Sequence, residues 1–297
     1  EATNNTLRTY GSLVYTPISD LDLKLVGSHE NSNYLNGYSE TMKHISTVRD
    51  GRNGYASRYT NKNVDDLIEL TAQYSISFDN HSLTGLAGYS WQQNIYENFG
   101  TSNFDFPTDK YSYNNIGAGQ AIKEGRASSY SYKEESKLIG YFFRMRYNFN
   151  RKYMLMASIR HEGSSKFGSD HKWANFPAVS AGWKLKEESF LENVNLINNL
   201  KIRAGYGVTG TAPSSPYMSQ SRLSYGSYYF SNGAWTPVIY PSTNPNPDLR
   251  WEKKSEINLG LDFAILDNRI SGTFDIYQRT TDDLIWNYNV PRPPYLY

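Results

Sequence analysis

The chain has 297 residues, with 30 Lys and Arg against 29 Asp and Glu, and a formal net charge of +1. This balance argues against a nucleic-acid-binding protein, which normally carries a strongly basic surface. Aromatic residues make up 15% of the chain, hydrophobic residues only 38%, and cysteine is absent. The composition excludes disulfides and Cys-based zinc sites, and it does not suit the large aliphatic core of a compact enzyme.

No stretch approaches the roughly 18 to 20 consecutive apolar residues that a membrane-spanning helix requires. The longest obvious apolar run, residues 138–143, stops at Arg144. Strands of about ten residues could still cross a bilayer. The first residues lack the basic and apolar regions of a signal peptide, so we interpret the start as mature or internal sequence.

Alternation of apolar and polar residues is the dominant signal along the chain, and it is typical of β-strands. Asn, Asp and Pro between the alternating blocks favour hairpin turns. The pattern predicts ten strands in five hairpins, which pair residues 7–16 with 21–31, 67–78 with 82–96, 137–149 with 152–161, 174–185 with 200–208, and 254–265 with 269–280.

Long segments separate these hairpins, at roughly 32–65, 97–135, 162–173 and 209–250, and they are rich in Tyr, Asn, Ser, Gly and Pro. Structureless loops of this length are uncommon in a compact soluble domain. Outer-membrane barrels, in contrast, join their strands by short periplasmic turns and long extracellular loops. The sequence therefore predicts an all-β protein with the antiparallel architecture of a transmembrane barrel, with these segments as extracellular loops.

The third hairpin shows the two faces of the predicted wall most clearly. A charge on the lipid side of a barrel costs about 2–4 kcal/mol at the midplane, so we expect the arginines to face the lumen. They could contact a plug or a solute, or they could simply be solvated. The expected lumen-facing set is Arg144, Arg146 and Arg160, and the expected lipid-facing set is Ile139, Tyr141, Phe143, Met145, Tyr153, Leu155 and Ile159.

Motifs for catalysis or cofactor binding are weak. The sequence GYGVTG at 205–210 matches a dinucleotide fingerprint, but Pro213 and Pro216 follow where that fingerprint requires a helix. The five histidines lack the spacing of a helical zinc site. Adjacent carboxylates on a strand point to opposite faces. We therefore predict no catalytic residue, no metal site and no cofactor.

An aromatic cluster lies in the longest loop. Tyr and Trp bury large rigid surfaces at low entropic cost, so these side chains could stack on a ligand. They could equally tie down the loop or contact a partner protein. The candidate substrate-binding residues are Tyr225, Tyr228, Tyr229 and Trp235, with Phe230 beside them.

The second half of the chain contains five characteristic stretches. They are RHEGSSKFG at 160–168, FPAVSAGW at 176–183, LKIRAGYGVTG at 200–210, NPDLRWE at 246–252, and NLGLDF at 258–263 with NRISG at 268–272. In this order they resemble the SusC/RagA family of TonB-dependent outer-membrane transporters. The resemblance is specific over about 138–290, whereas the first 130 residues agree mainly in the alternation of strands and loops. Two positions depart from the family pattern, Glu162 in place of Asp and Thr211 in place of Asn.

The resemblance implies a plugged barrel of about 22 strands, of which residues 1–297 would form about ten, without the plug or the TonB-contacting segment. It implies energised import of an oligosaccharide or peptide across the outer membrane. It also points to a member of the Bacteroidetes as the source. The implied partners are a SusD-like lipoprotein, the TonB complex and membrane lipid. Three prolines in 289–297 cannot donate to a ladder, so we expect no closing strand there.

Two other interpretations remain open on the sequence. A complete small barrel, acting as a passive porin or an outer-membrane enzyme, would share the strand pattern. A soluble carbohydrate-binding β-protein would share the alternation and the aromatic content.

Overall fold

The computed structural model describes residues 1–292 and 295. The last part of the proline-rich segment, including Pro293 and Pro294, lies outside the described residues. Ten strands pair in chain order in one antiparallel sheet, and two more form a separate hairpin. The strands are β1 (Ala2–Ile18), β2 (Leu21–Glu40), β3 (Tyr55–Phe78), β4 (His81–Phe104), β5 (Ser128–Phe149), β6 (Tyr153–Ser164), β7 (Trp173–Lys184), β8 (Ile197–Thr211), β9 (Leu223–Ser231), β10 (Ala234–Pro241), β11 (Glu252–Ile265) and β12 (Ile270–Asp282).

The ten strands of the main sheet confirm the predicted hairpins. The sheet order is β1 to β8, then β11 and β12, and its two edge strands are β1 and β12. The tight turns lie where the sequence indicated, and several turn residues adopt positive φ, among them Asn150 at 52° and Arg151 at 56°. Positive φ at both central residues is the pattern of a type I′ turn, whose twist matches the flanking strands.

The predicted long loops 32–65 and 97–135 are wrong as structureless segments. β2 continues to Glu40 and β3 begins at Tyr55, while β4 continues to Phe104 and β5 begins at Ser128. These extensions carry polar residues on both faces, so they have no apolar alternation to reveal them. Their backbones still pair in a ladder, which satisfies their hydrogen-bonding groups. The segment 209–250 likewise contains the β9–β10 hairpin.

The chain divides into two compact units, and the division crosses strands β1 to β5. Unit 1 comprises residues 1–11, 26–68 and 92–136, and unit 2 comprises residues 12–25, 69–91 and 137–297. Among the residues that the structure describes, helical structure is confined to short connections: α1 (Ile45–Arg49), η1 (Asp109–Asn114) and η2 (Ile116–Ala118) in unit 1, and η3 (Leu185–Glu187) and α2 (Ser189–Glu192) in unit 2.

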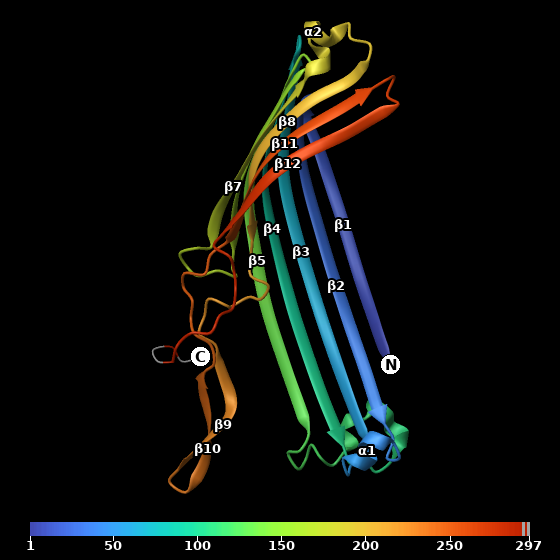
Figure 1. The fold of residues 1–297 in the computed structure, drawn as a ribbon. Helices are drawn as coiled ribbons and strands as arrows, with labels where there is room; N and C mark the ends of the chain where they lie inside the picture. Colours follow the sequence, from blue (N-terminus) through green and yellow to red (C-terminus); the bar gives the residue numbers. More distant parts are fainter. Residues whose placement is uncertain (293–294, 296–297) are drawn as a thin grey trace. The chain divides into compact units, whose positions relative to one another are not determined.

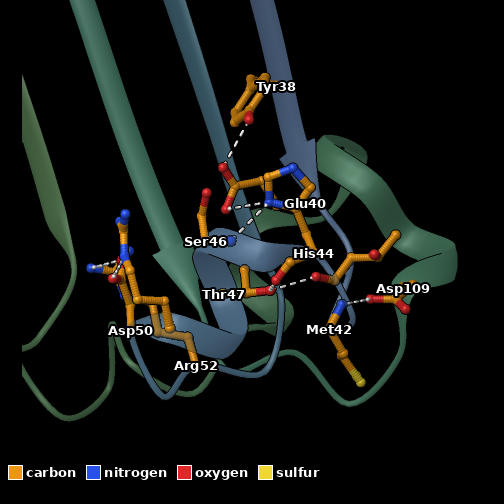
Figure 2. A network of polar contacts seen from close by, with 11 residues as sticks. Tyr38, Glu40, Met42, His44, Ser46, Thr47, Asp50, Arg52 and Asp109 are labelled. Carbon is orange, nitrogen blue, oxygen red and sulfur yellow. Dashed lines mark hydrogen bonds and ion pairs between the residues drawn. The ribbon is translucent and has the colours of Figure 1, made fainter.

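In unit 1, α1 and the neighbouring connections lie together at the ends of β2, β3 and β4 (Figure 1), and polar contacts hold them there. Thr47 of α1, 1% exposed, donates its hydroxyl to the carbonyl oxygens of Thr41 (2.7 Å) and His44 (2.8 Å). The backbone amide of Met42 donates to the Asp109 carboxylate at 2.9 Å, as Figure 2 shows. The two connections 41–54 and 105–127 are therefore joined to one another.

A second set of contacts in unit 1 surrounds Phe104. The guanidinium groups of Arg52 and Arg126 each lie 4.9 Å from the centroid of its ring. Asp105 accepts from the Asn53 amide at 2.9 Å and from Arg126 at 2.6 Å. The backbone hydrogen bond from Asn53, followed by the contact with Arg126, lowers the pKa of the Asp105 carboxyl.

The hydrophobic core of unit 2 is small and lies where three of the family-like sequence stretches meet. It contains Phe167, Ala174, Phe176 and Trp251. The Trp251 ring lies 4.6 Å from that of Phe167 and 5.3 Å from that of Phe176. Its indole N–H donates to the carbonyl oxygen of Lys172 at 2.9 Å. This cluster fixes the ends of the segment that carries the β9–β10 hairpin.

Candidate functional site

The β5–β6 register places the three predicted arginines on one face of the sheet in unit 2. Directly opposed residues share a face, and the register opposes Arg144 to Ser158, Arg146 to Met156, and Arg160 to Phe142. The intervening residues Tyr141 and Phe143 lie on the other face and are 52% and 48% exposed. The expected separation of charged and apolar side chains is therefore present. The assignment of the arginine face to a lumen stays a prediction.

The apolar face of unit 2 is bordered by aromatic side chains at both ends. Near the short turns, Tyr153 stacks between Phe149 and Trp183, with ring centroids 6.2 Å away on each side. Toward the other ends of the strands, Tyr141 lies 5.3 Å from Tyr89 and 6.2 Å from Trp173. Paired aromatic girdles of this kind flank the lipid-facing band of outer-membrane barrels.

The spacing of the two girdles matches a bilayer. Trp173 and Trp183 stand at opposite ends of β7 on the same face. Ten residues of strand span about 34 Å, or about 26 Å along the membrane normal at the usual strand tilt, and the apolar band of such barrels is about 25 Å tall. Val179, between them, is 45% exposed. Among the described residues, no helix is long and apolar enough to cross a membrane.

Polar groups hold the girdle near the short turns in place. The Trp183 indole N–H and the Tyr153 hydroxyl both donate to the Glu188 carboxylate, at 2.9 and 2.6 Å. The bond from Tyr153, and then that from Trp183, lowers the pKa of Glu188. An aromatic ring with a hydrogen-bonded polar tip suits an interface between hydrocarbon and water.

Arg160 makes the closest contacts of the predicted arginines. Its guanidinium binds the Glu162 carboxylate at 2.7 Å and the Ser90 hydroxyl at 3.0 Å, and it lies 5.4 Å from the Phe142 ring centroid. Gly140 leaves room for it, since a Cβ there would lie 2.7 Å from the guanidinium. Arg144 and Arg160 line a hollow of about 630 Å³, and Arg146 lines another of about 550 Å³.

A second charged cluster on this face was missed at the sequence level. Arg203 of β8 binds Asp262 of β11 through two bonds of 2.9 Å and reaches Asp275 of β12 at 3.2 Å. Alternation alone places each residue on a polar face. Their meeting depends on the register, which opposes Gly260 to both Arg203 and Asp275. Arg203 and Asp262 are 59 positions apart in the chain, and no local signal spans that separation.

The candidate aromatic residues lie on the β9–β10 hairpin, but they do not form one surface. Trp235 opposes Phe230 and Pro237 opposes Tyr228, so these four share a face. Tyr229 opposes Thr236 and lies on the other face. Tyr225 precedes Gly226, which has a φ of 101°. All four candidates are well exposed: Tyr225 81%, Tyr228 62%, Tyr229 63% and Trp235 68%. Their role in binding a substrate stays a prediction.

Comparison with known proteins decides the family. The model of the family "TonB dependent receptor-like, beta-barrel" matches residues 2–297. The chain belongs to this family. The TonB-dependent receptor P39 of Formosa agariphila is 34% identical over 72% of this chain and 20% of its own length. The TonB-dependent receptor SusC of Bacteroides thetaiotaomicron is 35% identical over 54% of this chain and 16% of its own.

A solved structure of the RagAB peptide transporter matches this TonB-dependent receptor barrel over 98% of the chain, with 25% identity and a TM-score of 0.87. The match covers 31% of that structure's chain. The chain spans about a fifth of the length of the receptor P39. They form part of an outer-membrane β-barrel, in a family of receptors and transporters rather than enzymes.

Apolar residues face outward in barrels of this kind. We therefore expect the face of this TonB-dependent receptor barrel that carries the aromatic girdles to meet lipid, and this assignment stays a prediction. Within the described residues, no group of three or more His, Cys, Asp or Glu side chains is placed to hold a metal ion.

Proposed function

We propose that the protein of which this barrel segment forms part imports a nutrient across the outer membrane, driven by TonB and together with a SusD-like surface lipoprotein. The observation that carries the proposal is the structural match to the RagAB peptide transporter over 98% of the chain. The similarity to SusC points to the same class. The solute is an oligosaccharide or a peptide. The plug and the TonB-contacting segment belong to parts of the protein beyond these 297 residues.

The arginine face is the wall that the solute or the plug contacts in this proposal. Arg144, Arg146 and Arg160 would line the lumen, because a polar interior is the rule in barrels of this kind. The hydrogen bonds of Arg160 to Glu162 and Ser90 support this role, since they hold the guanidinium in a fixed position.

The β9–β10 hairpin is the contact for the lipoprotein in this proposal. One face presents Tyr228, Phe230, Trp235 and Pro237 with exposed rings. Aromatic residues are enriched at protein interfaces, and ordering a protruding hairpin costs conformational entropy that a partner can offset. The opposite face, with Tyr229 and Thr236, provides a matched control on the same hairpin.

Uptake by cells that express the full-length protein tests the proposal. We expect uptake of oligosaccharide or peptide to stop when a protonophore collapses the energy supply. The double variant Phe230→Ala, Trp235→Ala should lose the co-purifying lipoprotein, whereas Tyr229→Ala, Thr236→Ala should retain it. Uptake that survives the protonophore would indicate a passive pore instead.

A further inference from the structure

A surface of unit 1, formed by β2, β3, β4 and the first part of β5, consists almost entirely of amide and phenol side chains. Tyr34, Tyr59 and Tyr96 follow one another across three strands: the rings of Tyr34 and Tyr59 are 6.2 Å apart, and the hydroxyls of Tyr59 and Tyr96 are 3.4 Å apart. We call this surface the Asn–Tyr face. Its central residues are Tyr34, Tyr59, Asn61, Asn63, Asn94, Tyr96, Asn98 and Tyr130.

The side chains of the Asn–Tyr face hold one another in place. Asn94 donates to Asn63 at 3.0 Å and to Asp65 at 2.8 Å, and Asn63 donates to Asp65 at 2.6 Å. The Tyr130 ring lies over Gly100, where a Cβ would be 2.5 Å from the ring. A ligand therefore meets a surface whose side chains are already ordered, which reduces the entropic cost of binding.

The centre of the face has hydrogen-bonding capacity to spare. The Tyr96 hydroxyl accepts from Asn98 at 3.3 Å and from Tyr59. The bond to Tyr96 raises the pKa of Tyr59 to about 12, as expected for a phenol whose proton is held. The amide oxygens of Asn61 and Asn98 are buried there and have no hydrogen-bond partner among the described residues. Two acceptors are thus unused at the centre of the face.

The charges of this region separate by face. The basic residues of the same strand segments, Arg58, Lys62 and Lys133, alternate with residues of the Asn–Tyr face and therefore lie on the opposite face of the sheet. The charged groups hydrogen-bonded at the Asn–Tyr centre are carboxylates, Asp65 and Glu134. Arg8, toward the β1 edge of this side, is already paired with Glu30. An anionic ligand would meet like charge without a counter-charge, which disfavours its binding. Hydroxyl groups, in contrast, both donate to and accept from amides and phenols.

Ring surfaces complete the chemistry. Tyr130 is 50% exposed and Tyr132 is 43% exposed. Exposed tyrosine rings offer a flat apolar area with a polar tip, which suits the C–H faces of a sugar ring flanked by hydroxyl groups. We propose that the Asn–Tyr face binds a neutral oligosaccharide and discriminates against oligosaccharides that carry carboxylate or sulfate groups. This inference rests on the proposed import function and assigns it a site and a charge preference.

A glycan array with neutral and acidic oligosaccharides, probed with the labelled full-length protein in detergent, tests the inference. We expect labelling of neutral spots at least about tenfold above that of acidic spots of equal length. Tyr96→Phe and Asn98→Ala should each lower the labelling of neutral spots about tenfold. Each variant removes one hydrogen bond to the ligand, and one such bond changes the affinity by about a factor of ten. Arg58→Gln, on the opposite face, should leave it unchanged.

Heat-modifiable migration checks that each variant is folded. Labelling of acidic spots only, or of none, would overturn the inference, as would an equal loss of signal in Arg58→Gln. The receptor could label no neutral spot while cells that express it still take up peptides in an energy-dependent way. In that case this inference would fail, and the proposed import function would stand. Loss of all energised uptake would remove the import function itself.

Discussion

Single residues decide how closely the connections in unit 2 pack. Gly168 lies against the backbone of Pro247, and a Cβ at this position would be 1.9 Å from the Pro247 carbonyl oxygen. Backbone atoms cannot rotate away as a flexible side chain can. The glycine of the stretch 160–168 therefore has a steric reason to be there, which the sequence alone did not reveal.

Replacing Gly168 with Ala tests this contact. We expect Gly168→Ala to lower the free energy of unfolding by about 1–3 kcal/mol, the usual cost of overpacking. Gly27→Ala is the matched control, because a Cβ at Gly27 meets nothing within 4 Å. Urea unfolding of the folded barrel in vesicles measures both. Equal free energies of unfolding for the two variants would show that the 165–172 connection can shift away from Pro247 without loss of stability.

At the scale of elements, β7 separates the two faces within adjacent residues. Val179 pairs with Ala157 and Tyr206 on the apolar face, and Ser180 pairs with Met156 and Gly205 on the arginine face. Both lie near the middle of the band between Trp173 and Trp183. Two adjacent residues of β7 therefore lie on opposite faces of the sheet, Val179 on the apolar face and Ser180 on the arginine face.

Two arginine substitutions use this adjacency. Val179→Arg should destabilise the folded barrel by about 2–4 kcal/mol, because it places a charge in hydrocarbon near the midplane. Ser180→Arg should cost much less, since its side chain joins the polar face. Urea titration in vesicles gives both free energies. A larger loss for Ser180→Arg would reverse the assignment of the faces.

The connections of unit 1 respond to pH through Asp105. Its folded pKa is lowered, so the stability it contributes is fully present above its unfolded value of about 3.9. That contribution disappears as the pH falls through the folded pKa. We expect residues 105–127 to exchange amide hydrogens faster below about pH 4, after correction for intrinsic rates. Asp105→Asn should exchange fast at neutral pH as well and lose the pH dependence. An unchanged profile in this variant would assign the effect to another group.

At the scale of the whole molecule, the girdles set the depth of the protein in the membrane. Trp173 and Trp183 are 46% and 38% exposed on the apolar face, whereas Trp251 is 4% exposed. In vesicles of brominated lipid, bromines near the headgroups should quench Trp173 and Trp183 more strongly than bromines near the chain ends. The variants Trp173→Phe and Trp183→Phe isolate each contribution, and Trp251 should respond to neither lipid. Stronger quenching of Trp173 and Trp183 by bromines near the chain ends would contradict their expected position at the membrane interfaces.

The polar strand extensions show how far a sequence pattern reaches. In β3, Asn61 and Asn63 lie on one face while Arg58 and Lys62 lie on the other. With both faces polar, these segments lie outside the apolar band, because a charge facing lipid is costly. The same property removes the alternation that indicates strands, so the sequence predicts loops at residues 32–40, 55–65, 97–104 and 128–135.

The sequence by itself determined the class of fold, the five hairpins and the faces of β5 and β6, because alternation and turn chemistry are local properties of neighbouring residues. It also determined the family, through stretches such as NPDLRWE at 246–252. Only the tertiary structure brought Arg203 to Asp262 and Asp275, Trp251 to Phe167, and Asn94 to Asn63. The arginine and asparagine contacts depend on the register between strands, and the contact of Trp251 with Phe167 depends on how two connections pack. Both are fixed over distances in the chain that no local pattern encodes.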